Sequence, residues 1–189
     1  EVTLSNRKDS TVTHNVDLHA VWGQGGGAAA TVVAPGESKS FVFKAMNPGL
    51  YVYHCATPII PQHISSGMYG LILIEPAGGL PKVDKEFYMM QGEIYTDGAA
   101  TGHRSFDVPS LLAEHPTDVV INGSRMALAN NPMKVKVGDN VRVFFGVGGP
   151  NLTSAFHAIG TVYDKVFPEG DLDPKHVHKC HCPVILPRH

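Results

Sequence analysis

Hydrophobic and polar residues alternate with a period of two in many short segments of the chain, as they do in β-strands that are buried on one face. Strands are predicted over residues 1–4, 10–16, 39–45, 50–55, 69–75, 87–95, 133–137, 141–145 and 155–162. Turn signals rich in glycine and proline separate them, and one short helix is predicted over residues 108–114, with Asp107 as its N-cap. This pattern is typical of all-β sandwiches and barrels.

A run rich in proline and glycine at residues 76–81 predicts a boundary between two β domains, over residues 1–78 and 79–189. A loose internal repeat supports two units, because Val2-Thr3-Leu4 precedes His14 much as Val141-Arg142-Val143 precedes His157. By this repeat the first unit lacks its opening strands and the second its closing strands. We therefore interpret the sequence as a piece of a larger two-domain protein, or one from which a signal peptide has been removed.

Composition excludes several classes of protein. The formal charge is −2, and no run of lysine and arginine suggests a nucleic-acid partner. The longest apolar stretches, residues 70–74 and 141–147, are far shorter than the roughly 20 residues of a membrane-spanning helix. The eleven histidines and three cysteines stand out instead. Cys180 and Cys182 are too close in sequence for a favourable disulfide, so Cys55 is more consistent with a ligand or a nucleophile than with a structural bridge.

Four residues of the first unit have the side chains of a blue-copper electron-transfer site. Two imidazoles, one thiolate and one long axial thioether form that ligand set, and His14, Cys55, His63 and Met68 supply it. Seven residues separate Cys55 from His63 and four separate His63 from Met68, so we expect one turn to wrap three ligands round one ion. His14 would come from a neighbouring strand.

Strand parity predicts a second metal site next to the first. Successive side chains of a strand point to opposite faces, so His54 and Cys55 cannot face the same ion if their strand is regular. By the same rule His14 and His19 point apart, whereas Asp17 shares the face of His19. One face then offers His14, Cys55, His63 and Met68, and the other offers Asp17, His19 and His54. The peptide between His54 and Cys55, with Cα atoms ~3.8 Å apart, would join the two sites.

The motifs that carry these residues resemble those of copper-containing nitrite reductases. HNVDLH, PGLYVYHC and HISSGMYG lie in the first unit, and FDVPSLLAEHPTDVVING, GGPNLTSAFHAIG and DKVFPEGDL lie in the second. The resemblance covers residues 1–176, and the gap between Cys55 and His63 is similar to that of the shorter-loop branch of the family. It implies two tandem cupredoxin-like Greek-key domains, each a β-sandwich or barrel and both incomplete here.

The resemblance also implies the role of each site residue. Type-1 copper would be held by His14, Cys55, His63 and Met68, and type-2 copper by His19, His54 and a third histidine that is absent from this chain. The implied catalytic pair is Asp17 and His157, and Ile159 would shape the substrate pocket. Family members are homotrimers, and the third histidine comes from the second domain of a neighbouring subunit.

The implied reaction is the one-electron reduction of nitrite to nitric oxide and water, with the electron relayed from type-1 copper through Cys55 and His54 to type-2 copper. Such an enzyme would take its electron from a small cupredoxin or cytochrome c, in the periplasm or at the cell exterior. It would serve denitrification or nitrate assimilation. We expect this chain alone to have poor activity, because a type-2 ligand and several strands are missing.

Two other functions use fewer of these residues. A non-enzymatic electron carrier would need only the type-1 ligands and would leave Asp17, His19 and His157 without a role. A multicopper oxidase would need His-X-His pairs and a His-Cys-His run, whereas the tail has the inverse order, Cys180-His181-Cys182. Structural interpretations are also open: Asp17 could cap a turn, Met68 could be packing, and His157 could be a hydrogen-bonded core histidine.

Two further motifs have no role in this scheme. The run at residues 25–27 follows no strand-to-helix pattern of a phosphate-binding loop, so we interpret it as a flexible glycine loop. The tail from about residue 177 differs from the family, and we interpret the last dozen residues as the product of a reading-frame change or a truncation. Its cysteines and histidines match no familiar zinc-finger spacing.

Overall fold

The computed structural model describes residues 1–189 except 99–101, 174, 176–177, 181–183 and 186–189. The first half contains the strands β1 (Val2–Ser5), β2 (Asp17–Leu18), β3 (Ser38–Phe41), β4 (Gly49–His54) and β5 (Tyr69–Ile74). The second half contains β6 (Lys85–Ile94), β7 (Asp118–Ile121), β8 (Val141–Val147), β9 (Ser154–Ala155), β10 (Tyr163–Val166), β11 (His178–Cys180) and β12 (Val184–Ile185). Short helices connect them: α1 (Ile60–Ser65), α2 (Val108–Leu112) and α3 (Ala127–Asn130), with the 3-10 segments η1 (Gln24–Thr31) and η2 (Pro168–Gly170). The prediction of a mostly β protein is confirmed.

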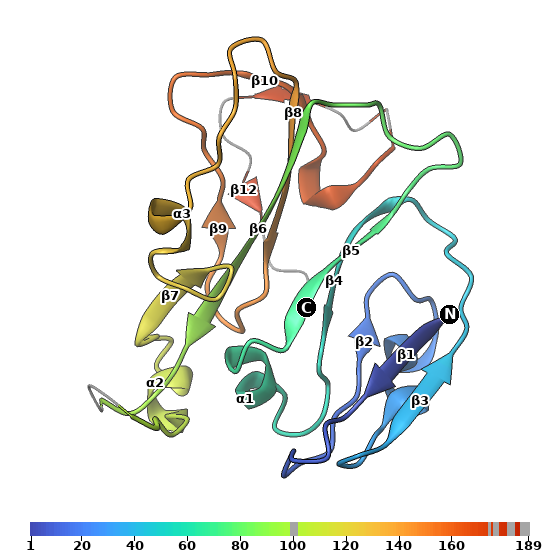
Figure 1. The fold of residues 1–189 in the computed structure, drawn as a ribbon, viewed down its shortest axis with the longest axis vertical. Helices are drawn as coiled ribbons and strands as arrows, with labels where there is room; N and C mark the ends of the chain where they lie inside the picture. The colour runs from blue at the N-terminus through green and yellow to red at the C-terminus, as the bar shows by residue number, and fades with distance from the viewer. Residues whose placement is uncertain (99–101, 174, 176–177, 181–183, 186–189) are drawn as a thin grey trace.

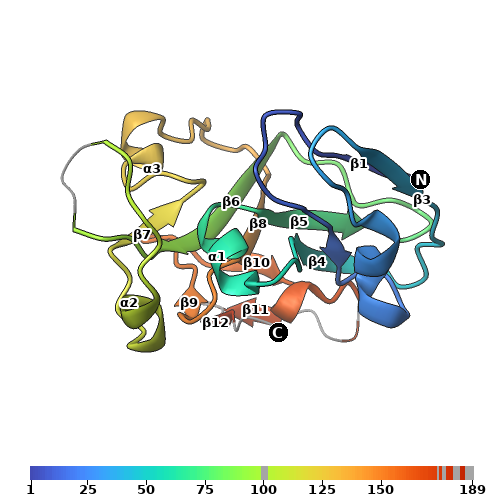
Figure 2. The same ribbon diagram turned by 90° about the horizontal axis from the view of Figure 1, so that it is seen from below.

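Two three-stranded sheets form the centre of the molecule (Figure 1). In the first sheet β4 lies between β2 and β5 and is antiparallel to both, with Asp17 opposite His54. In the second sheet β6 lies between β7 and β8, antiparallel to β7 and parallel to β8. Figure 2 shows β1 and β3 on one side of the molecule, α2, α3 and β7 on the other, and α1 between them. The first sheet therefore presents the end of β4 next to α1.

The two sheets pack closely where the second one carries glycine. Gly92 on β6 and Gly148 just after β8 face the ring of Tyr69, and Gly146 faces the side chain of Leu71. A Cβ at Gly146 would lie 2.8 Å from the Met90 sulfur, so no larger residue fits there without movement. Burial raises the pKa of the Tyr69 hydroxyl. The predicted boundary at residue 78 lies in the link between β5 and β6, and the division into two domains stays a prediction.

Two predicted strands, over residues 10–16 and 133–137, are wrong, and the one over 155–162 is mostly loop. Side chains take the place of a ladder in the first case: the Asn6 amide donates to the Val12 carbonyl at 2.8 Å, and the Val16 N–H donates to Thr31 Oγ1 at 3.0 Å. Such side-chain bonds satisfy the backbone and compete with strand pairing. The predicted helix is present as α2, but it ends at Leu112, and the Asp107 carboxylate accepts a hydrogen bond from the Ser110 hydroxyl.

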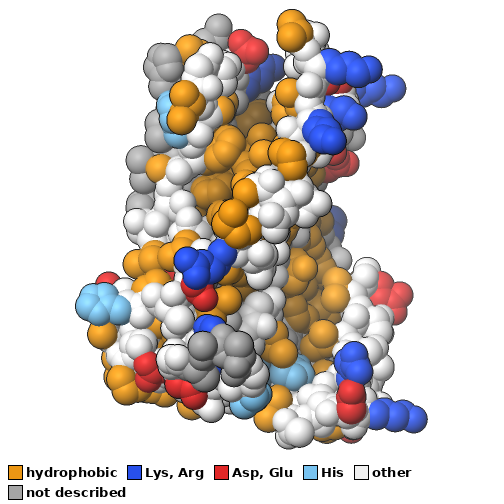
Figure 3. Space-filling model, turned by 60° about the vertical axis from the view of Figure 1, so that its left-hand side comes forward, with side chains coloured by type: hydrophobic (Ala, Val, Ile, Leu, Met, Phe, Trp, Pro, Cys, Tyr) orange, Lys and Arg blue, Asp and Glu red, His pale blue; other side chains and the backbone are white. Residues whose placement is uncertain are grey.

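Among the described residues, no helix has the length and apolar character needed to cross a membrane. The second half has its core around Met89, Met90 and Tyr95, all at most 2% exposed. Because Met89 and Met90 are adjacent, they point to opposite faces of β6, and both faces of that strand are covered. On the face drawn in Figure 3, hydrophobic side chains gather in a hollow of the surface.

A buried carboxylate connects β6 to the segment that follows β8. Glu93 is 1% exposed and accepts hydrogen bonds from the backbone N–H groups of Leu152 (2.7 Å) and Asn151 (3.2 Å), and from the Tyr95 hydroxyl. The Asn151 amide in turn donates to the Tyr95 hydroxyl at 2.9 Å. Burial raises the pKa of Tyr95 strongly, so its hydroxyl stays protonated and remains a donor. This network holds the start of the loop that leads to His157.

Glu93→Gln should therefore destabilise the protein by about 1–3 kcal/mol, because an amide NH₂ would face donors that now meet an oxygen. Urea unfolding followed by circular dichroism measures this loss. Glu86→Gln is the matched control: Glu86 is 51% exposed in its pair with Arg142, so its loss should cost at most about 1 kcal/mol. Equal effects of the two substitutions would contradict a stabilising role for the buried network.

Candidate metal centres

Three of the four predicted ligands of the first site lie together. Cys55 Sγ is 3.7 Å from His14 Nδ1 and 3.5 Å from His63 Nδ1. The two imidazole rings meet edge to face with their centroids 5.2 Å apart. All three ligand atoms lie within 4.8 Å of one another. Cys55 is 5% exposed, so this cluster places a buried sulfur between two nitrogen atoms.

Three different elements bring these side chains together. His14 is held by a pair of backbone hydrogen bonds with Val33, at 3.0 and 2.8 Å. Cys55 directly follows β4, and His63 lies on α1, so a short helix rather than a simple turn carries this residue. Burial, and secondly the charge of His14, lower the pKa of His63. The lowered pKa favours the neutral imidazole, which is the form that binds a metal.

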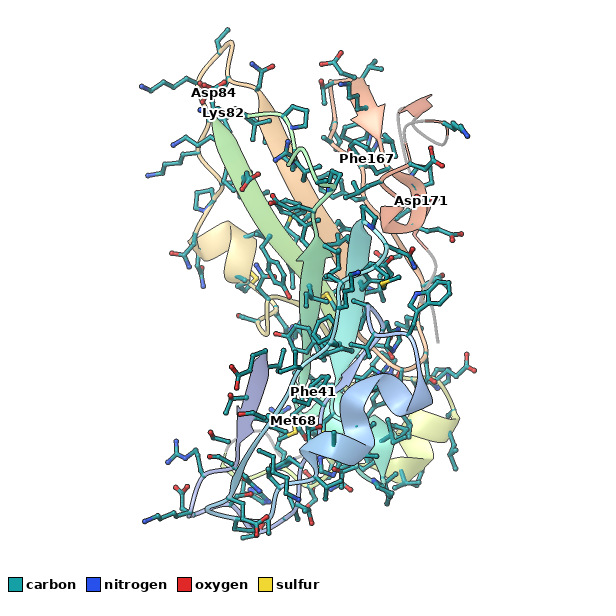
Figure 4. The ribbon with its side chains drawn as sticks, turned by 90° about the vertical axis from the view of Figure 1, so that its right-hand side faces the viewer. Phe41, Met68, Lys82, Asp84, Phe167 and Asp171 are labelled. Carbon is teal, nitrogen blue, oxygen red and sulfur yellow. The ribbon has the colours of Figure 1, made fainter. Side chains whose placement is uncertain are left out.

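Backbone hydrogen bonds place Met68 beside the same cluster. Its carbonyl accepts the Cys55 N–H at 3.0 Å, and its own N–H donates to the His63 carbonyl at 3.2 Å. Met68 is 38% exposed, and Figure 4 shows it at the same end of the molecule as Phe41, away from Lys82 and Asp84. The thioether ligand stays a prediction.

Asn15 is a site residue that the sequence analysis missed. Its Oδ1 accepts the Ala56 N–H at 2.7 Å and lies 3.8 Å from Cys55 Sγ. The side chain thus ties the segment of His14 to the residue after Cys55. Its position next to His14 was the available signal, but its partner Ala56 lies 41 residues further along the chain, where local rules do not reach.

A second cluster contains Asp17, His19 and His54, whose ligand atoms also lie within 4.8 Å of one another. The Nε2 atoms of His19 and His54 are 3.2 Å apart, and their ring centroids are 5.1 Å apart. His54 Nδ1 is 3.0 Å from the Cys55 carbonyl oxygen, to which it can donate. That bond keeps the proton on Nδ1 and leaves the Nε2 lone pair for a metal.

Neighbouring residues of the chain thus belong to different clusters. His54 ends β4 and lies with Asp17 and His19, whereas Cys55 lies with His14 and His63. The pairing of β4 with β5 continues through the Cys55 N–H, and this extended backbone explains why His54 and Cys55 point in opposite directions. His14 lies outside any strand longer than a single bridge, so parity along residues 14–19 is not what separates the clusters there.

His157 belongs to neither cluster, and Ile159 follows it two residues later in the chain. They occupy the loop between β9 and β10, where His157 is exposed and Ile159 is 92% exposed. The Ala158 N–H donates to the Tyr163 hydroxyl at 2.6 Å and anchors this loop. Among the described residues, Asp17 completes the group of ligand atoms that contains His19 and His54. Several of the cysteines and histidines of the tail fall on residues 176–177 and 181–183, outside the described part of the chain.

The donor chemistry of both clusters fits copper. A buried thiolate with two imidazoles is the ligand set of trigonal blue-copper sites, and the two imidazoles of the second cluster are ligands that copper also accepts. The three residues of the first cluster come from different parts of the fold, and backbone hydrogen bonds hold each of them. The fold therefore fixes the arrangement of this cluster.

Comparisons with known proteins agree with these motifs. A copper-containing nitrite reductase of Neisseria meningitidis serogroup A is 57% identical over 90% of this chain and 45% of its own length, and one of Alcaligenes faecalis is 34% identical over 90% and 50%. The chain thus spans about half the length of the curated relatives it matches. No family model matches the chain.

Solved structures give the same result for the fold. The copper nitrite reductase of Nitrosomonas europaea superposes with a TM-score of 0.79 at 33% identity, over 97% of this chain and 64% of that one. The copper-containing nitrite reductase of Thermus scotoductus SA-01 gives 0.81 at 28% identity, over 98% and 42%. A multicopper oxidase at 21% identity, with a TM-score of 0.72, shares the fold alone. Over the part that it spans, the chain is therefore a relative of the copper-containing nitrite reductases, and the recognition made from its motifs is confirmed.

Proposed function

We propose that the protein to which this chain belongs reduces nitrite to nitric oxide: one nitrite, one electron and two protons give one nitric oxide and one water. The observation that carries the proposal is the pair of clusters joined through adjacent residues. His54 and Cys55 contribute to different metal-ligand groups, and the His54 ring also reaches the Cys55 carbonyl at 3.0 Å. A one-electron reduction needs both an electron entry point and a separate place for the anion.

In this proposal type-1 copper would be held by His14, Cys55, His63 and Met68, and type-2 copper by His19 and His54 with a third histidine from another subunit. When bound, the first ion would exchange single electrons and the second would bind an anion as a Lewis acid. The covalent path from Cys55 to His54 would give the electron a short route between the sites, since the two Cα atoms are ~3.8 Å apart.

Asp17 would handle a proton at the second site. Its carboxylate oxygen lies within 4.8 Å of the ligand atoms of His19 and His54, so it would hydrogen-bond an oxygen of bound nitrite and pass a proton to it. Proton delivery at this oxygen favours its departure as water. The backbone of Asp17 pairs with that of His54 in the sheet, which places Asp17 at the end of β4.

His157 and Ile159 would complete the site of a neighbouring subunit in a homotrimer. Both are exposed on one loop and lie outside the cluster of Asp17, which supports a role across an interface. The His157 imidazole would supply the second proton, while Ile159 would give the pocket an apolar wall. The hydrophobic hollow in Figure 3 offers surface that an assembly would cover.

The remaining parts of the proposal concern the surroundings of the protein. A small cupredoxin or cytochrome c would supply the electron, in the periplasm or at the cell exterior. The reaction would serve denitrification or nitrate assimilation.

The direct test is nitric oxide release by the copper-loaded protein, measured with an electrode in the presence of nitrite and a chemical reductant. We expect release that stops when copper is removed by a chelator and returns when copper is added. Copper binding without any nitric oxide would instead favour the electron-carrier alternative.

A further inference from the structure

We infer that the glycine turn at residues 25–27 positions the carboxylate of Asp17, with Gly26 as the residue in contact with it. The inference rests on the proposed role of Asp17 in nitrite reduction. The sequence predicted a flexible loop at this place. The structure instead shows a packed turn at the start of η1, next to β2 and β3 (Figure 2).

The turn has a backbone conformation that favours glycine at three consecutive positions. The φ angles of Gly25, Gly26 and Gly27 are 58°, 54° and 95°. Residues with a side chain rarely adopt these angles, because their Cβ approaches the carbonyl oxygen. The three glycines therefore allow the chain to reverse within one turn and bring its backbone against β2.

Gly26 is buried against the residues of β2. A Cβ on Gly26 would overlap Asp17 Oδ1 and would lie 2.7 Å and 2.8 Å from the Leu18 nitrogen and oxygen. The backbone of Gly26 thus packs directly against the Asp17 carboxylate. Gly27 packs in the same way on β3, where a Cβ would lie 2.5 Å from Phe41 Cζ. Gly25 differs, since its nearest neighbour would be Ala28 Cβ at 3.8 Å.

Thr31 holds the glycine turn in place relative to Asp17. It is fully buried, its hydroxyl donates to the Gly27 carbonyl at 3.0 Å, and its Oγ1 accepts the Val16 N–H at 3.0 Å. One side chain therefore connects the end of the glycine turn to the residue before Asp17. Among the described side chains, no hydrogen bond to the Asp17 carboxylate is found, so packing against Gly26 is what limits its positions there.

The consequence for the reaction follows from the small size of the site. The Asp17 oxygen lies in the same 4.8 Å group as the His19 and His54 nitrogens. A methyl group on Gly26 would push the carboxylate out of this group, and a displacement of about 1 Å in a reacting group can lower a rate ~100-fold. Gly26 is thus a positioning residue for the proposed proton transfer.

Gly26→Ala and Gly25→Ala form a matched pair, because both place alanine at a left-handed φ and only the first meets Asp17. We expect Gly26→Ala to lower nitrite turnover roughly 10- to 100-fold, and Gly25→Ala to lower it less than about threefold. Neither touches His14, Cys55 or His63, so the visible absorption of the thiolate–copper bond should be unchanged in both. In the Asp17→Asn background, Gly26→Ala should add almost no further loss. An equal loss in both backgrounds would overturn the inference.

The unfolding temperature of the copper-free protein tests the contact between Gly26 and Asp17, and this measurement does not depend on nitrite reduction. Gly26→Ala should lower the midpoint more than Gly25→Ala does, and the Asp17→Ala background should recover part of the difference, because it removes the oxygen that the new methyl group meets. Asp17→Asn keeps the same shape and should recover none. No recovery with Asp17→Ala would overturn the contact, whereas recovery in a protein that never reduces nitrite would overturn the proposed function alone.

Discussion

Replacing Cys55 with serine should abolish the intense visible absorption of the copper-loaded protein and stop nitrite reduction. The absorption arises from the bond between a thiolate and Cu(II), and Cys55 is the sulfur that lies between His14 and His63. Serine has nearly the same shape, so the fold should persist while the hydroxyl binds copper poorly. Visible spectra and the copper content per chain measure the result.

His19→Gln is the complementary control, because it removes a ligand of the second cluster only. We expect this variant to keep the visible absorption and to lose one copper per chain, whereas Cys55→Ser loses the absorption and the other copper. Circular dichroism confirms that each variant is folded. Colour that survives Cys55→Ser would show that the first site is assigned wrongly.

The part of the site that could be predicted from sequence lies on regular backbone. β4 spans Gly49–His54 and its pairing continues through the Cys55 N–H, so parity predicts opposite sides for the two side chains, which lie in different clusters. The short spacing from Cys55 to His63 also indicates that both residues lie in one local segment. Local rules suffice here because the partners are near one another in the chain.

Elements that depend on distant partners could not be predicted in this way. Residues 10–16 alternate like a strand, yet Asn6 and Thr31 satisfy their backbone instead. The helix that carries His63 was also missed, because its sequence, IPQHIS, contains a proline and has no residue buried. The glycine turn looks like a loop in sequence, since its meaning comes from contact with Asp17 on another element.

Asp17→Asn should lower nitrite turnover roughly 100- to 10,000-fold, the range that a positioned proton donor contributes. Asparagine keeps the shape that packs against Gly26, but it cannot deliver a proton. The carboxylate is outside the cluster of His14, Cys55 and His63, so the visible absorption should stay the same. Nitric oxide release at saturating nitrite, with a reductant in excess, measures the change.

This variant also separates an enzyme from an electron carrier, which would have no use for Asp17. Asp9→Asn is the matched control, because Asp9 is exposed in its pair with Arg7 and belongs to neither cluster. We expect that control to leave turnover unchanged. If Asp17→Asn did the same, the carboxylate would have no part in the reaction, and its place beside His19 and His54 would be only structural. A large loss with an intact spectrum would instead show that electron entry and proton delivery are separate tasks, performed by the cluster of Cys55 and the cluster of Asp17 respectively.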